Sequence, residues 1–311
     1  MALTRSDIPD LLLPGLRAEF ESAYRSEVDE SIAQRIATVI HTSTPVQKYA
    51  WLGSTPPMRE FVDERRPSGL SAYAVSIEDK VFESTIAVER KAIEDDQIDL
   101  IRLRIRDLAY RVAQHRHHMV IQALVSGFDA AGYDGVSLFS GQHPVGGSTW
   151  SNRTSLALST NALADAINQM MTVPDDQGIP LGIVPDTLVV GPKLQWLASE
   201  IVDSPVVVYK GNATDTASAT NYLNAFQGKV KVVVSPYLTG GADDYWYLLD
   251  TKRPIRAVIL QQRSDVPVEF AALDASSKSE SAFMRDRFLY GVRARYNVGL
   301  GLWQTAFGGQ I

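Results

Sequence analysis

Apolar side chains recur at helical spacing over a long central stretch, and this is the strongest pattern in the chain. Seven residues follow one another at spacings of three and four: Ile98, Ile101, Ile105, Leu108, Val112, His115 and Met119. Such spacing places side chains on one stripe of a helix. We expect one helix from about residue 95 to Gly127, with acidic residues 94–96 at its positive amino end. Such a helix would be about 48 Å long, far longer than an average helix, so we expect other elements of the fold to pack along it.

Towards the amino terminus the pattern changes from helical to extended. Residues 15–40 have helical periodicity and end before a Thr-Ser-Thr-Pro sequence. Beyond a strongly charged segment, small side chains alternate with larger apolar ones over residues 72–77. A polar turn and a second strand-like run from Val81 to Val88 follow, and together the two runs predict a β-hairpin. An isolated hairpin is marginal in water, so it needs a partner surface, either its own domain or another subunit.

The C-terminal half alternates helix and strand before it finishes in a β pattern, which is typical of a layered α+β or α/β protein. The expected helices are Asn161–Met171 and Lys193–Ile201. The expected strands are Thr187–Val190, Val230–Val234, Trp246–Leu249, Ala257–Gln261, Val266–Phe270, Phe288–Val292 and Leu300–Trp303. A polar stretch, Gly211–Thr220, is expected to be a loop.

Composition bounds the classes of protein that remain. With 311 residues, 45% hydrophobic and 21% charged, one or two domains are expected. A compact globule of 34.2 kDa would expose about 13,000 Å². The absence of cysteine excludes disulfides and cysteine-ligated metal sites. A net charge of −6 argues against a protein that neutralises many phosphates. Without a membrane-length apolar run or a secretory signal, we expect a cytoplasmic chain with no membrane partner.

Candidate chemistry is sparse. His115 and His118 would share a helix face at a spacing used in di-metal bundles, but His115 lies on the apolar stripe and no further ligands are paired along the helix. Nucleophile-elbow, phosphate-loop and dinucleotide motifs are absent. Arginines are interleaved with acidic residues, which favours salt bridges over phosphate contacts. We therefore assign no catalytic, cofactor-binding or metal-ligating residue and expect a structural or assembly protein, not an enzyme.

Six sequence blocks in order across residues 46–306 carry a family resemblance. They are Tyr49–Gly53; Phe82–Thr85; Ile93–Asp96; Tyr133–Gly135 with His143-Pro144 and Ser151-Asn152; Leu249–Thr251 with Arg253-Pro254; and Phe283–Asp286 with Tyr290–Val292 and Arg295. With these blocks the chain resembles the Mu-like bacteriophage major head subunit family. Ala50 stands where glycine is expected, and Ser140 and Gly141 stand where acidic residues are usual, which are local departures.

The resemblance implies an α+β fold of the Hong Kong 97-like major capsid protein type. Its expected parts are an N-terminal arm (1–45), an extended β-hairpin loop (46–91), a peripheral domain with a spine helix (92–155), an axial domain (156–255), and strands that return to the peripheral domain and end at the axial domain (256–311). A subunit with an arm and a projecting hairpin should expose well over the compact value of about 13,000 Å².

The resemblance also implies a function. The chain would self-assemble into pentamers and hexamers of an icosahedral virion shell that encloses double-stranded DNA without sequence-specific binding. Assembly would occur in the host bacterial cytoplasm, with a scaffold or protease, a portal and decoration proteins as partners. An encapsulin-like compartment shell is the alternative within the same fold. An enzyme with an unrecognised site is the third reading, and it predicts a deep pocket with convergent polar groups.

The extended loop supplies the expected subunit contacts. Its aromatic residues are candidate apolar anchors, and its charged residues would set register through charge complementarity. The anchors are Trp51, Phe61 and Tyr73, and the charged residues are Arg59, Glu60, Arg65 and Arg66.

Overall fold

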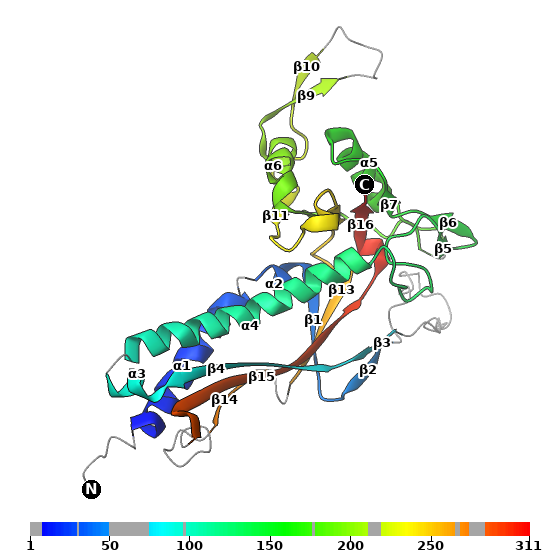
Figure 1. The fold of residues 1–311 in the computed structure, drawn as a ribbon. Helices are drawn as coiled ribbons and strands as arrows, with labels where there is room; N and C mark the ends of the chain where they lie inside the picture. The colour runs from blue at the N-terminus through cyan, green and yellow to red at the C-terminus, as the bar shows by residue number, and fades with distance from the viewer. Residues whose placement is uncertain are drawn as a thin grey trace, which may run out of the picture.

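The computed structural model describes residues 8–29, 31–49, 75–95, 98–175, 178–210, 219–264, 268–273 and 284–311. Figure 1 shows an elongated lower part built along helix α4 (Ile98–Ser126) and a smaller part near the C-terminal end of that helix. The chain exposes 17609 Å², about a third more than a compact chain of this mass. This confirms the expectation of a large uncovered surface.

Helix α4 confirms the central prediction. It spans 29 residues, and the predicted stripe buries Ile101, Ile105, Leu108 and Val112. His115 and Met119, at the end of the stripe, are partly buried. The opposite face is not purely polar, because Leu100 and Leu103 are 50% and 57% exposed.

A five-stranded sheet lies beneath α4, and its longest strand is β15 (Arg287–Leu300). Residues 289–294 of β15 pair with β14 (Val268–Leu273) on one edge and with β4 (Lys80–Glu89) on the other. Further along, β15 pairs with β13 (Val258–Arg263), which pairs in parallel with β1 (Ala37–Thr42). All partners of β15 are antiparallel to it, whereas β1 and β13 are parallel, so the sheet is mixed.

Three predictions about this sheet are wrong. The expected hairpin between residues 72–77 and Val81–Val88 does not form, because β3 (Val75–Glu78) pairs with β2 (Val46–Tyr49) while β4 forms a ten-residue ladder with β15. Residues 37–42 form β1 and not the end of a helix, since β13 offers them a parallel partner. The strand expected at Leu300–Trp303 is absent because β15 ends at Leu300 and a 3-10 turn begins at Trp303.

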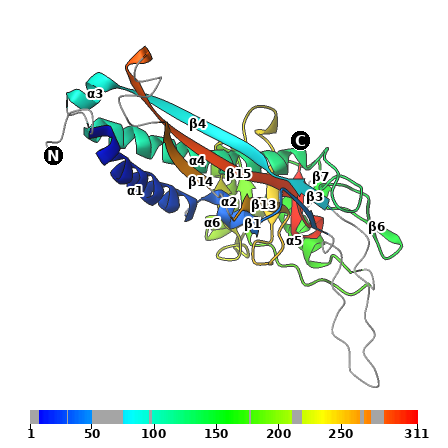
Figure 2. The same ribbon diagram turned by 90° about the horizontal axis from the view of Figure 1, so that it is seen from below.

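Helix α1 (Ile8–Asp29) packs beside α4 on the same face of this sheet (Figure 2). Leu16 and Phe20 are 1% exposed, and the Phe20 ring lies 5.2 Å from that of Phe270 on β14. The Arg17 guanidinium donates to the Phe270 carbonyl at 3.1 Å, and Arg106 of α4 pairs with Glu19. This part of the predicted arm therefore rests on its own subunit.

The smaller part contains a second five-stranded sheet with two helices. In order across the sheet, the strands are β11 (Lys231–Val234), β8 (Thr187–Val190), β12 (Trp246–Leu249), β16 (Ala306–Gly309) and β7 (Arg153–Thr154). The helices are α5 (Thr160–Met171), which packs near β16, and α6 (Gln195–Asp203), which packs on β8 and β11. The predictions for β8, β11, β12, α5 and α6 are confirmed.

The remaining elements are short. Two-stranded sheets form from β2 and β3, from β5 (His143–Val145) and β6 (Ser148–Trp150), and from β9 (Val206–Lys210) and β10 (Ala219–Leu223). Short helices are α2 (Ile32–Ile36) and α3 (Arg90–Glu94), and the 3-10 turns are η2 (Pro192–Leu194), η3 (Gly240–Ala242) and η4 (Trp303–Thr305). Strand β10 begins inside the expected Gly211–Thr220 loop, whose residues 211–218 lie outside the described part of the chain.

Candidate functional site

The seven predicted contact residues all lie in one segment. They are Trp51, Arg59, Glu60, Phe61, Arg65, Arg66 and Tyr73, and residues 50–74 lie outside the described residues. Their role in subunit contacts stays a prediction.

The structure does describe the strands on either side of this segment, and both are fixed to their own subunit. Tyr49, at the end of β2, is 1% exposed and its hydroxyl donates to Gln261 Oε1 on β13 at 2.8 Å. Gln261 Nε2 donates in turn to the Ile77 carbonyl of β3 at 3.2 Å. Burial raises the pKa of Tyr49 to about 12, so this hydroxyl keeps its proton. Segment 50–74 therefore starts and ends at a firmly packed base.

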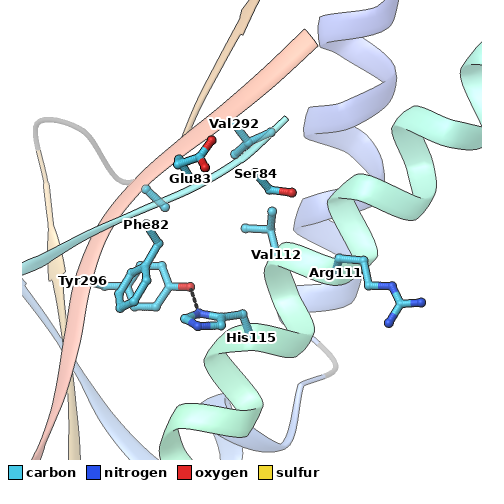
Figure 3. Close-up of a pocket in the computed structure, with 9 residues that line it drawn as sticks. Phe82, Glu83, Ser84, Arg111, Val112, His115, Val292 and Tyr296 are labelled. Atoms are coloured by element: carbon cyan, nitrogen blue, oxygen red, sulfur yellow. Dashed lines mark hydrogen bonds between the residues drawn. The ribbon is translucent and has the colours of Figure 1, made fainter. Parts of the chain in front are cut away.

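A pocket of about 250 Å³ lies between α4 and the β4–β15 pair (Figure 3). Its aromatic lining is formed by Phe82, His115 and Tyr296, with the Phe82 ring 4.6 Å from the His115 ring and 4.9 Å from the Tyr296 ring. Val112, Val292 and Ala294 complete the apolar lining. Sequence analysis missed this pocket because the pairing of β4 with β15 joins segments far apart in the chain.

The polar groups at this pocket are already engaged. His115 Nδ1 lies 2.7 Å from the Tyr296 hydroxyl. Burial, with a smaller effect from the nearby His118 charge, lowers the pKa of His115, so the ring is neutral and forms a hydrogen bond with the Tyr296 hydroxyl. Glu83 and Arg111 border the pocket, and the Arg111 head group points away from the rings in Figure 3. An apolar floor with engaged polar groups suits binding of an apolar side chain better than bond-breaking chemistry.

The neighbouring histidines do not converge on one point. His117 Nε2 lies 3.0 Å from the Ser235 hydroxyl, and His118 packs against the Tyr237 ring. Burial, together with the His118 charge, lowers the pKa of His117 to about 4. Among the described residues, no group of three or more His, Asp or Glu side chains is placed to hold a metal ion.

Several residues of the resemblance blocks form a buried junction. Asn152 Nδ2 donates to the carbonyls of Leu138, Trp303 and Ala306, and its Oδ1 accepts from the Ser140 amide at 2.8 Å. His143 stacks on Trp303 with ring centroids 4.0 Å apart. These contacts tie the segment after α4 to the C-terminal segment, so Asn152 and His143 stabilise the fold.

The described surface leaves several large apolar side chains open to solvent. Trp196 on α6 is 78% exposed and Val81 on β4 is 56% exposed, in addition to Leu100 and Leu103 on α4. These side chains lie on three different elements, so they are separate exposed positions and not one apolar patch. No helix in the described part of the chain combines the length and apolar character needed to cross a membrane.

Comparison with known sequences identifies relatives over nearly the whole chain. The profile of the family described as Mu-like prophage major head subunit gpT matches residues 10–159, 149–238 and 238–310. The Mu-like prophage FluMu major head subunit of Haemophilus influenzae is 26% identical over 98% of this chain and 74% of its own length. The major capsid protein of Escherichia phage Mu is 27% identical over 94% of this chain and 72% of its own length.

Solved structures show the same fold. The procapsid of bacteriophage JBD30 matches with a TM-score of 0.55 and 24% identity, over 97% of this chain and 75% of that chain. The virus-like particle from Pyrococcus furiosus matches with a TM-score of 0.51 and 10% identity, over 96% of this chain and 98% of that chain. The expected α+β Hong Kong 97-like fold is confirmed. Because the family profile also covers almost the entire sequence, the chain belongs to the Mu-like prophage major head subunit family.

Proposed function

We propose that this chain is the major capsid protein of a Mu-like phage or prophage head, and that it assembles through pentamers and hexamers into an icosahedral shell around double-stranded DNA. The observation that carries the proposal is the family match, which runs in order from residue 10 to residue 310. The fold agrees with it, and the large exposed surface of the single subunit is what neighbouring subunits would cover.

We assign the parts of the subunit as the sequence suggested. These are an N-terminal arm (1–45), an extended loop (46–91) whose last strand, β4, joins the first sheet, a peripheral domain (92–155), an axial domain (156–255) and returning strands (256–311). The pairing of β2 with β3 on either side of residues 50–74 is consistent with the assigned extended loop. The second sheet, which includes the C-terminal strand β16, is consistent with the assigned axial domain. Helix α1, inside the assigned arm, packs on its own α4.

The assembly mechanism follows from symmetry. Head-to-tail contacts close rings, and closure turns individually modest contacts into a stable shell. The seven loop residues proposed above would contact the neighbouring subunit, with Trp51 and Phe61 as anchors. Since the chain has no cysteine, shell strength would come from interlocked subunits, and the net charge of −6 suits a container that holds DNA without gripping it.

The wider setting follows from the same proposal. Assembly would take place in the host bacterial cytoplasm with a scaffold or protease, a portal and decoration proteins. An encapsulin-like compartment would share the fold, and the match to the Pyrococcus furiosus particle at 10% identity speaks for the fold alone. The family profile and both curated relatives favour the phage head.

The test is electron microscopy of the purified, concentrated chain over a range of salt concentrations. Rings, tubes or shells are expected. A chain that stays monomeric at every concentration and salt would contradict the proposal.

A further inference from the structure

Strand β4 has an open outer edge. Its ten residues pair with β15 in one unbroken register, from Glu89 opposite Arg287 to Lys80 opposite Tyr296. In the described part of the chain no strand pairs with the other edge, and β4 contains neither a proline nor a bulge. A straight edge of about 33 Å therefore presents unpaired backbone donors and acceptors. Such an edge is a template for pairing with another chain, and natural proteins usually protect it.

The face of the sheet beside this edge is only partly covered. Helices α1 and α4 lie side by side on the sheet, and β4 lies on the side of α4 away from α1 (Figure 2). Helix α4 covers Val88 of β4 but leaves the pocket beside Phe82 and Ser84. The open edge and the pocket therefore adjoin along one strand.

The chemistry of this site suits an extended polypeptide. Strand addition draws its affinity from backbone hydrogen bonds along an edge and its specificity from side-chain pockets next to it. Here the pocket floor of Phe82, His115 and Tyr296 would receive an apolar side chain. The charges of β4 are mixed (Lys80, Glu83 and Glu89, with Glu89 paired to Arg287), so the strand offers no cationic run for a phosphate backbone.

We infer that the outer edge of β4 and the adjoining pocket form one docking site for an extended segment of a second copy of this chain. The inference rests on the proposed function, which supplies many identical neighbours. The whole subunit exposes about 4,600 Å² more than a compact chain, and a standard interface covers about 800 Å² per partner, so the surface is large enough for several contacts between copies, of which this edge would be one. Charges of both signs at the pocket margin, Glu83 and Arg111, match a segment of this mixed-charge chain.

One test fills the pocket from within. Ser84→Trp places an indole in the space that the neighbour's side chain would enter, whereas Ser84→Ala leaves the space open. The tryptophan variant should need about tenfold or more protein to assemble, and the alanine variant should assemble like the wild type. Circular dichroism and thermal melting report whether the tryptophan variant is folded. A folded Ser84→Trp subunit that assembles at the wild-type concentration overturns the inference.

A second test needs no perturbing side chain. Hydrogen exchange of peptides covering residues 80–89 is compared between subunits and assembled particles, with residues 246–249, which are already buried in the single subunit, as the reference. Because the chain lacks cysteine, Ser84→Cys also gives a single thiol whose labelling rate reports access to the pocket. Assembly should slow the hydrogen exchange of residues 80–89 and the labelling of the Ser84→Cys thiol by about tenfold or more each. Particles with an unprotected β4 overturn the docking site but leave the proposed function standing, whereas a wild-type chain that never assembles overturns both.

Discussion

His143 Nε2 lies 3.0 Å from Asn152 Oδ1, and the orientation of the asparagine amide makes the histidine the donor. The amide cannot be reversed, because its nitrogen faces three carbonyls and its oxygen accepts from the Ser140 amide. The other ring nitrogen, Nδ1, lies 2.6 Å from the buried Asp134 carboxyl. One asparagine thus holds together the segment after α4, strand β5 and the C-terminal segment.

Asn152→Ala should be strongly destabilising. It removes the hydrogen-bond partner that Asn152 supplies to the Leu138 carbonyl, the Ser140 amide and His143 Nε2, and each unpaired buried group costs about 1 to 3 kcal/mol. We expect a loss of at least about 3 kcal/mol in urea unfolding. Asn161→Ala, at an exposed position of α5, is the matched control and should change stability by about 0.5 kcal/mol or less. Equal stability of the two variants would show that the amide network carries no stability.

Stability should fall between about pH 6.5 and pH 4 because of His117. This ring is buried against Ser235 and Tyr237, and its folded-state pKa of about 4 lies below the ordinary value of 6.5. The unfolded chain therefore takes up a proton that the folded chain excludes, so the stabilising effect is complete above pH 6.5 and is lost as pH falls towards 4. The full effect is at most about 3 kcal/mol.

The measurement is the urea midpoint as a function of pH for the wild type and for His117→Gln. Glutamine cannot take up the proton, so its curve should be flatter over this range. Parallel curves for the two proteins would assign the acid sensitivity to other groups.

Gly309→Ala should destabilise the second sheet. A Cβ at Gly309 on β16 would lie 2.1 Å from Trp246 Nε1, which itself donates to the Leu156 carbonyl. Such crowding in a packed core costs about 1 to 3 kcal/mol. Gly241→Ala is the control, since nothing lies within 4 Å of its added Cβ. Thermal melting should show a lower midpoint for the Gly309 variant only, and a normal midpoint for it would mean that β16 can shift.

The sequence could predict those elements whose pattern is local. Helix α4 repeats its apolar positions every three or four residues, and β8 and β12 are short apolar runs buried on both faces. Strand β1 could not be separated from the preceding helix, because its partner β13 lies over 200 positions away in the chain. The same holds for β4, whose apolar alternation is real but whose partner is β15 and not β3.

The candidate site could not be predicted from the sequence, because it depends on contacts between segments that are distant in the chain. The pocket joins Phe82 of β4, His115 of α4 and Tyr296 of β15, and no local pattern connects these residues. His115 is on the predicted helix stripe, yet only the sheet shows that it meets a tyrosine hydroxyl. The open edge of β4 is likewise a property of the topology, since a strand's free edge depends on which strands pair with it.

The double variant Trp51→Ala/Phe61→Ala tests the contacts proposed for the extended loop. Both residues lie between β2 and β3, whose base is held by the buried bond from Tyr49 to Gln261. Because that base is held by contacts among β2, β3 and β13, the variant should remain folded and soluble with an unchanged thermal midpoint. Loss of two aromatic anchors at each of many symmetric contacts, about 2 kcal/mol or more apiece, should prevent shells from forming.

Sedimentation velocity and electron microscopy separate the two outcomes, with Tyr49→Phe as the comparison. That variant removes the hydroxyl at the base and leaves Gln261 Oε1 unpaired, so it should lower stability by about 1 to 3 kcal/mol. Loss of shells without loss of stability assigns Trp51 and Phe61 to subunit contacts. Normal shells from the double variant would instead place the apolar contacts of the head elsewhere, with the exposed side chains of Trp196 and Val81 as the next positions to replace.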